Sequence, residues 1–206
     1  MPSPSISIEP DTRRQHYECI PPTNRVPGNK AIWVGIFSEM TEFALMFVVY
    51  FLAKAHNPEL FNEGPTRLNT FAGTLNTLIL LSSSFFVARA MIAIRQNRRQ
   101  VCAHWLWMAI LAGCAYLVVK YWEFQWNAAQ GIHVKTDLFT GVYYYMTFNH
   151  FLHVGWGSFA VFFVLMRLKS GAYTADKHEG LEAVAVYWHM IDLAWIVIFP
   201  LLYVFR

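Results

Sequence analysis

The chain has 206 residues, of which 56% are hydrophobic and 14% are charged, and its formal net charge is +3. Soluble domains carry about 25% charged residues, so this composition argues against a soluble domain and indicates an integral membrane protein. The aromatic residues lie inside apolar runs, which argues against nucleic-acid binding. The three cysteines lack CxxC and CxxCH spacing, which excludes a covalently attached c-type haem and offers no thiolate cluster.

Residues 1–30 are polar and rich in proline, and we expect them to form an irregular tail. They contain no apolar stretch of the kind found in cleaved signal peptides. We therefore expect the first membrane helix to serve as the insertion signal.

Five apolar segments follow, at about 31–53, 72–94, 104–126, 138–166 and 183–205. Each can cross a bilayer as a helix, for which about 20 residues suffice. Only helices and closed barrels satisfy the backbone inside lipid, and these runs are too long and too uniformly apolar for barrel strands. The sequence thus predicts an all-α fold, an integral membrane five-helix bundle over residues 31–206. The connections contain turn formers such as Asn57-Pro58 and Gly64-Pro65.

The basic residues predict the orientation, since lysine and arginine concentrate in cytoplasmic loops. The N-terminal side of the five spans would carry eleven of the 16, and the other side five: Lys54, Arg67, Lys120, Lys135 and Arg206. We expect the N-terminus in the cytoplasm and the C-terminus in the periplasm, in a bacterial inner membrane.

Ionisable residues occur deep in three spans, where each costs roughly 2.5–3.5 kcal/mol on insertion scales and normally has protein partners. They form a candidate cluster at similar depth, consisting of Glu39, Glu42, His150, His153, His189 and Asp192. One interpretation is a metal site in the bundle core, and the other is a structural or proton-handling polar core. Di-iron bundles need Glu-x-x-His pairs on two helices, and none occurs in the spans, so we favour the second interpretation and expect no metal.

Other residues suggest helix packing. Gly73, Thr77 and Ser84 would form a small-residue face that lets another helix approach closely. Lys120 and Glu123, three residues apart, would neutralise each other. Pro200 lacks an amide hydrogen and should kink the fifth span.

Several runs resemble subunit III of the haem-copper oxidases. Residues 187–195, Tyr-Trp-His-Met-Ile-Asp-Leu-Ala-Trp, resemble the signature "YWHFVDVVW" that closes this subunit. Residues 38–43 resemble its "SEVxFF" segment, in which Glu39 matches a glutamate that carbodiimides modify. Residues 147–154 resemble "TGFHGxHV", with His150 and His153 at the two histidines but without the glycines. Further matching residues are Asn76 in an "LNTxxLLxSS" run, Glu123 before Phe124, Glu182 and Trp188.

The resemblance covers residues 31–206 and implies the five-helix branch of the family. The segments 57–63 and 178–182 favour the NorE type, which is encoded with nitric oxide reductase. It implies a non-catalytic subunit with no cofactor of its own, bound to a haem-containing catalytic subunit of a terminal oxidase or nitric oxide reductase. The partner would hold haem with copper or non-haem iron. The chain would stabilise it and assist proton supply, with phospholipid bound. The Gly73/Thr77/Ser84 face and Gly155-Trp156-Gly157 would be surfaces for the partner.

Two other functions stay open on the sequence alone. The chain could be an autonomous membrane di-metal oxidase or hydroxylase, which would retain metal when purified by itself. It could also be a proton or small-solute carrier, which would show flux in liposomes.

Overall fold

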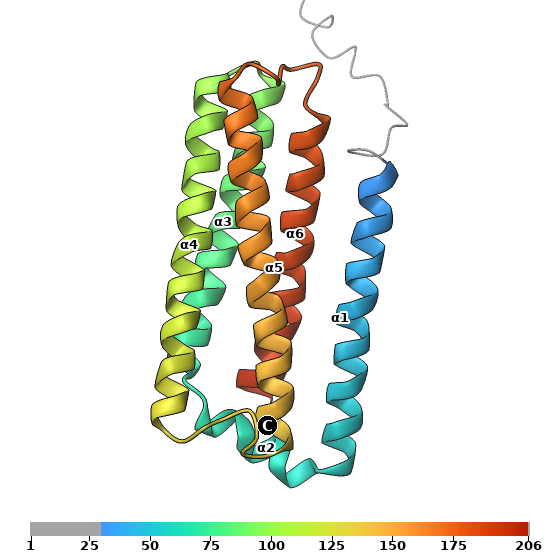
Figure 1. Ribbon diagram of the computed structural model, residues 1–206, viewed down its shortest axis with the longest axis vertical. Helices are drawn as coiled ribbons and strands as arrows, with labels where there is room; N and C mark the ends of the chain where they lie inside the picture. Colours follow the sequence, from blue (N-terminus) through green and yellow to red (C-terminus); the bar gives the residue numbers. More distant parts are fainter. Residues whose placement is uncertain (1–29, 206) are drawn as a thin grey trace, which may run out of the picture.

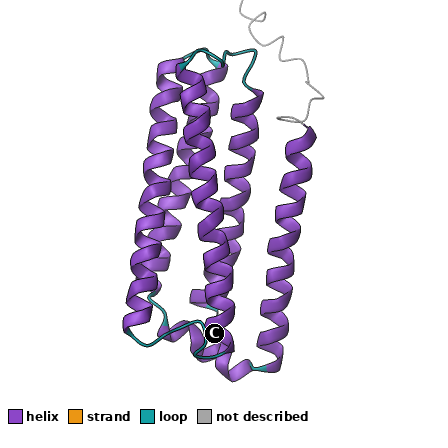
Figure 2. Cartoon of the chain, in the orientation of Figure 1, coloured by secondary structure: helices purple, strands orange, loops and turns teal. Residues whose placement is uncertain are grey.

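The computed structural model describes residues 30–205, and these residues are helical apart from short connections (Figure 2). In chain order the helices are α1 Lys30–His56, α2 Pro58–Arg67, α3 Thr70–Arg95, α4 Arg99–Ala129, α5 Leu138–Lys169, α6 Glu179–Phe199 and the π-helical turn η2 Pro200–Val204. Most of the expected tail, with Cys19 and the basic residues Arg13, Arg14 and Arg25, lies outside the described residues.

Five helices of the described chain are long and apolar enough to cross a membrane. They are α1, α3, α4, α5 and α6 continued by η2, with lengths of 25 to 32 residues in their apolar parts. The prediction of an all-α protein with five membrane helices is thus confirmed. The observed helices extend two to five residues beyond most of the predicted limits, because polar and basic residues at the ends continue the helices.

Helices α3, α4, α5 and α6 form a close-packed bundle, while α1 stands at its edge beside α5 and α6 (Figure 1). In the most apolar window of α1 only 17% of the residues are buried, against 50% in α6. Four helices therefore supply most of the core, to which α1 adds Ile36, Phe43, Met46 and Tyr50. Clefts lie between α1 and the neighbouring helices.

Helix α2 differs from the turn-rich connection expected between the first two spans. Pro58 occupies the first helical turn, where its missing amide hydrogen costs nothing. Phe61 is fully buried and packs edge-to-face on both Tyr50 and Phe139. A side chain at Gly64 would collide with the Phe139 ring, so glycine permits the close contact with α5. Burial of an aromatic face stabilises a helix that local propensity does not predict.

The start of α5 is fixed by a capping box. The Asp137 carboxylate accepts a hydrogen bond from the Thr140 amide at 2.8 Å, and the Thr140 hydroxyl accepts one from the Asp137 amide at 3.1 Å. Arg67 at the end of α2 forms an ion pair with the same carboxylate at 2.7 Å. Burial alone would raise the pKa of Asp137, but the hydrogen bonds from Thr140 and Arg67 outweigh it and lower the pKa.

The last span changes its helical form at Pro200, where a kink was expected. Helix α6 ends at Phe199, and η2 continues it as a wider π-helical turn closed by a hydrogen bond from the Phe205 amide to the Pro200 carbonyl at 2.9 Å. The Tyr50 hydroxyl donates to the Leu201 carbonyl at 2.6 Å and ties this turn to α1. The wider turn directs Tyr203 into the bundle, where it is 3% exposed.

The loops α3–α4 and α5–α6 and the start of α1 lie at one end of the bundle (Figure 1). These loops and the helix ends beside them carry the basic residues Arg95, Arg98, Arg99, Arg167, Lys169 and Lys177. Basic side chains of the described chain thus gather at one end of the bundle, as the predicted order of spans and loops required. The side of the membrane that this end faces stays a prediction.

Candidate functional site

The six ionisable residues of the candidate cluster do not lie in one place. Glu39, Glu42 and His153 come together between α1 and α5. His150 lies alone among aromatic rings in the core, and His189 pairs with a serine of α3. On α5, His150 lies in the aromatic core while His153 reaches Glu39 of α1. On α6, His189 and Asp192 both lie toward Ser84 of α3, so similar depth does not bring the six residues together.

We call Glu39, Glu42, Asn149 and His153 the α1–α5 cluster. His153 Nε2 lies 2.6 Å from Glu39 Oε2. The Asn149 side-chain amide donates to Glu42 Oε1 at 2.6 Å. One ligand atom from each of Glu39, Glu42 and His153 lies within 4.8 Å of the other two, so these three residues could hold a metal ion.

The Glu39–His153 contact is a hydrogen bond between a carboxyl group and an imidazole ring. His153 Nδ1 lies 2.9 Å from the Asn149 carbonyl oxygen, which only accepts, so Nδ1 carries hydrogen. Nε2 then either donates to a Glu39 carboxylate or accepts from a Glu39 carboxylic acid. In both forms the hydrogen bond joins α1 to α5.

This cluster opens onto a cleft of about 520 Å³ in the bundle surface, lined by Glu39, His153, Gly155, Trp156 and Tyr187 among others. The side chain of Glu39 is 32% exposed and that of His153 is 14% exposed. The pair is therefore partly exposed at the surface of the bundle.

His150 is fully buried, and neither ring nitrogen has a hydrogen-bond partner in the described protein. Its ring stacks on Trp195 with centroids 5.0 Å apart and meets Tyr116 edge-on at 5.7 Å. The side chain fills space between α4, α5 and α6, and this packing role is the only one that its contacts indicate.

His189 and Asp192 face α3. Ser84 Oγ and His189 Nδ1 share a hydrogen bond of 2.6 Å. Asp192 is 4% exposed and has Ser84 nearby, but its carboxylate oxygens have no hydrogen bond of standard geometry. These residues link α3 to α6 and do not reach the α1–α5 cluster.

The remaining family-motif residues have local contacts. Asn76 and Trp188 are buried in the core, and their polar atoms find no partner among the described residues. Glu182 lies 3.2 Å from His178 and 3.5 Å from Arg95, at the end of the bundle where the basic loops gather.

The Gly73/Thr77/Ser84 face is an internal packing face, which corrects the expectation that it is a partner surface. A side chain at Gly73 would meet the Tyr203 ring at 3.0 Å. Thr77 accepts a hydrogen bond from the Trp195 indole at 2.9 Å. Gly157 likewise faces Trp188 and Ile191. These small residues lie in contacts among α3, α5, α6 and η2 within the chain.

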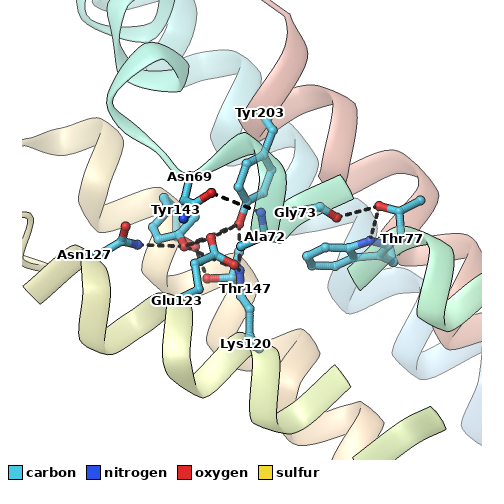
Figure 3. Close-up of polar contacts among 11 residues, drawn as sticks. Asn69, Ala72, Gly73, Thr77, Lys120, Glu123, Asn127, Tyr143, Thr147 and Tyr203 are labelled. Atoms are coloured by element: carbon cyan, nitrogen blue, oxygen red, sulfur yellow. Dashed lines mark hydrogen bonds and ion pairs between the residues drawn. The ribbon is translucent and has the colours of Figure 1, made fainter. Parts of the chain in front are cut away.

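A second polar group was largely missed by sequence reasoning, and we call it the enclosed cluster: Lys120, Glu123, Asn127, Tyr143 and Tyr203. Lys120 Nζ donates to Glu123 Oε2 at 3.2 Å and to the Tyr203 hydroxyl at 2.7 Å. Glu123 Oε1 accepts from the hydroxyls of Tyr143 at 2.7 Å and Tyr203 at 2.5 Å (Figure 3). The Asn127 amide donates to Tyr143 at 3.0 Å.

The enclosed cluster has no access to solvent, since Lys120, Glu123 and Asn127 are all 0% exposed. The Lys120 ammonium also lies 5.1–5.4 Å from the centres of four aromatic rings. The spacing of Lys120 and Glu123 predicted their ion pair, which the structure shows. Nothing in the sequence predicted that tyrosines from α5 and η2 would complete it.

The chain was compared with known proteins. The family model for cytochrome c oxidase subunit III matches residues 27–206. A cytochrome c oxidase subunit 3 of Thermostichus vulcanus is 32% identical over 98% of this chain and 95% of its own length. One from a Synechocystis strain is 31% identical over 82% of this chain and 71% of its own length. A heme-copper oxidase subunit I+III of Aeropyrum pernix is 27% identical over 84% of this chain, which corresponds to 22% of its own length.

Proposed function

This chain belongs to the cytochrome c oxidase subunit III family and is a subunit III-like membrane subunit of a haem-copper oxidase, and we propose that its role is to bind and stabilise the haem-containing catalytic subunit. In this proposal the chain carries out no redox chemistry, and haem and copper reside in the partner. The relative whose name combines subunits I and III supports direct contact between the two kinds of subunit.

The acceptor reduced by the partner is oxygen in this proposal. The relatives described above are named as oxidase subunits, whereas the sequence features that favoured the NorE type are confined to two short segments. A nitric oxide reductase partner is the alternative. Oxygen and nitric oxide consumption by the purified complex distinguish the two.

The outer face of α5 around Gly155 is the contact surface that we propose. A side chain placed at Gly155 would have no heavy atom within 4 Å, so the glycine is not required for packing within this chain. The neighbouring side chains on the same face are large and exposed: Trp156 is 66% exposed and Phe159 is 58% exposed. Small residues beside aromatic ones allow a partner helix to approach closely inside lipid.

Co-purification tests this proposal with a matched pair of variants. A tagged chain, extracted in mild detergent from respiring cells, is expected to bring down a haem-containing subunit. Gly155→Leu should insert and fold normally but recover much less haem. Gly157→Leu should instead impair folding, because the new side chain meets Trp188 and Ile191 inside the chain. If the wild-type chain never recovers a haem protein, the proposal is wrong.

The α1–α5 cluster favours a second role, in proton supply to the partner. Glu39 and His153 form a hydrogen bond beside an open cleft, and proton transfer needs a donor and an acceptor within this distance. In the assembled complex, Glu39→Gln should lower turnover while the haem content stays unchanged. If the Glu39→Gln complex turned over at the wild-type rate at every pH, the proton-supply role would be wrong. The proposed stabilising role would not be affected.

We also propose that the basic end of the bundle faces the cytoplasm, which follows from the distribution of lysine and arginine. A reporter enzyme fused after Arg99 should then be active only if it is a cytoplasmic reporter. Activity of a periplasmic reporter at that position would reverse the orientation.

A further inference from the structure

The α1–α5 cluster presents three metal-ligating side chains that the subunit role does not use together. Glu39 and Glu42 come from successive turns of α1, and His153 comes from the middle of α5. In the described residues the charged partner of these carboxylates is His153, and no lysine or arginine lies within 4.0 Å of them. Two carboxyl groups thus lie beside one imidazole at membrane depth, where uncompensated charge is costly.

We propose that Glu39, Glu42 and His153 form a binding site for a divalent transition-metal cation such as zinc. A dication with two carboxylates and a neutral imidazole gives a complex with no net charge, which suits a site of low polarity. The nitrogen ligand favours zinc and related metals over calcium or magnesium, which prefer oxygen alone.

His153 is already oriented as a metal ligand. Its Nδ1 donates to the Asn149 carbonyl oxygen at 2.9 Å, so Nε2 is the nitrogen that faces the two glutamates. Histidines that bind metals commonly donate their other ring nitrogen to a carbonyl or carboxylate, which fixes the tautomer and the ring orientation.

Asn149 supports two of the three ligands at once. Its backbone carbonyl holds His153, and its side-chain amide donates to Glu42 Oε1 at 2.6 Å. Ligating carboxylates in metal sites are usually held by such an outer hydrogen bond. The second carboxylate is therefore held near the first by a residue of the opposite helix and does not simply extend away from the bundle.

The ligand atoms need only small movements to bind zinc. They lie within 4.8 Å of one another, and tetrahedral zinc with ligands at about 2.1 Å would bring them to about 3.4 Å apart. Rotation of the flexible glutamate side chains covers this difference. The fourth position would open to the 520 Å³ cleft, which offers an entry route and room for a water ligand.

Zinc would take the position of the hydrogen between Glu39 and His153. Its ligands are carboxylates and an unprotonated His153 Nε2, so any proton on these atoms is released on binding. This proposal departs from the expectation of no metal, which rested on the shared depth of the residues and on spacing that fails the di-iron pattern. It depends only on the geometry of this chain and does not require the proposed subunit role.

Zinc titration of the purified, chelator-treated full-length chain tests the proposal. Equilibrium dialysis with metal analysis should give one zinc per chain. Glu42→Gln should weaken binding at least about 100-fold, the upper end of the loss caused by removing even an outer-shell partner. Glu42 lies on the bundle surface, so this variant should fold normally.

Matched controls separate this site from other zinc-binding groups. Glu63→Gln and His104→Gln change the same residue types at exposed positions away from the cleft and should bind zinc like the wild type. Asn149→Ala keeps all three ligands and should weaken binding about 10-fold. Cobalt bound in place of zinc should give a visible spectrum that Glu42→Gln abolishes. The proposal would be overturned if the wild-type chain showed no saturable zinc binding. It would also be overturned if Glu42→Gln and His153→Gln bound zinc as tightly as the wild type.

Discussion

The enclosed cluster and the α1–α5 cluster contain similar chemical groups in opposite settings. In the enclosed cluster, Lys120 and Glu123 are fully buried, and every charge has an opposite charge and phenol hydrogen bonds around it. In the α1–α5 cluster, two carboxylates share one histidine beside an open cleft. A fully buried group of paired charges can hold helices together, whereas a partly exposed group can also exchange protons or cations.

The difference follows from the helices that supply each cluster. The enclosed cluster lies where α4, α5 and η2 pack on one another, so rings fill the space around the charges. The α1–α5 cluster lies at the seam with the peripheral helix α1, which is little buried. The enclosed cluster is structural because it lies inside the packed helices, whereas the α1–α5 cluster lies at their edge.

The largest effect should come from breaking the charge balance of the enclosed cluster. Lys120→Met leaves Glu123 as an unpaired buried carboxylate, and we expect a loss of about 3–5 kcal/mol of unfolding free energy in detergent. The double variant Lys120→Met/Glu123→Gln should recover much of that loss, because no buried charge remains. A double variant as unstable as the single one would show that the charge pair is not what matters.

Removing one hydrogen-bonding group from the same cluster should cost less. Tyr203→Phe deletes the hydroxyl that donates to Glu123 at 2.5 Å and accepts from Lys120 at 2.7 Å, while the ring still fills its place. Loss of hydrogen bonds to charged groups predicts about 1.5–3 kcal/mol. The matched control Tyr121→Phe changes an exposed tyrosine on the outer face of α4 and should have no measurable effect.

The Arg67–Asp137 ion pair at the start of α5 is partly exposed, and substitutions of Asp137 test its contribution to stability. Asp137→Ala removes the cap of α5 and should cost about 1 kcal/mol. Because the pKa of Asp137 is lowered in the folded protein, its contribution is present above the unfolded pKa of about 3.9. It should be lost as the pH falls through the lower folded pKa. Acid unfolding of wild type and Asp137→Asn should therefore converge at low pH, and parallel curves would contradict this assignment.

The smallest effect on stability should come from the α1–α5 cluster. Glu42→Gln keeps a hydrogen-bonding partner for Asn149 and changes a group on the bundle surface, so we expect less than about 0.5 kcal/mol. The same variant should strongly weaken zinc binding. A large loss of stability would mean that this cluster, too, is structural, and the contrast between the two clusters would disappear.

Local sequence determined the number and type of the membrane helices, because apolar length and charge placement set which segments enter a bilayer. It also determined the Lys120–Glu123 pair, since residues three apart on a helix are neighbours whatever the fold. The short helix α2 was not predicted, because its stability comes from Phe61 packing on rings that are distant in sequence.

Tertiary structure alone decided which polar residues meet. Glu39 and His153 are 114 positions apart, and Lys120 and Tyr203 are 83 apart, so no spacing rule connects them. Depth in the membrane suggested a single cluster of six residues, but contact also requires that side chains point to the same side of their helices. The rotation of each helix about its axis is set by packing with its neighbours. For this reason the sequence determined the helices, while the packed bundle decided which charges are enclosed and which remain open.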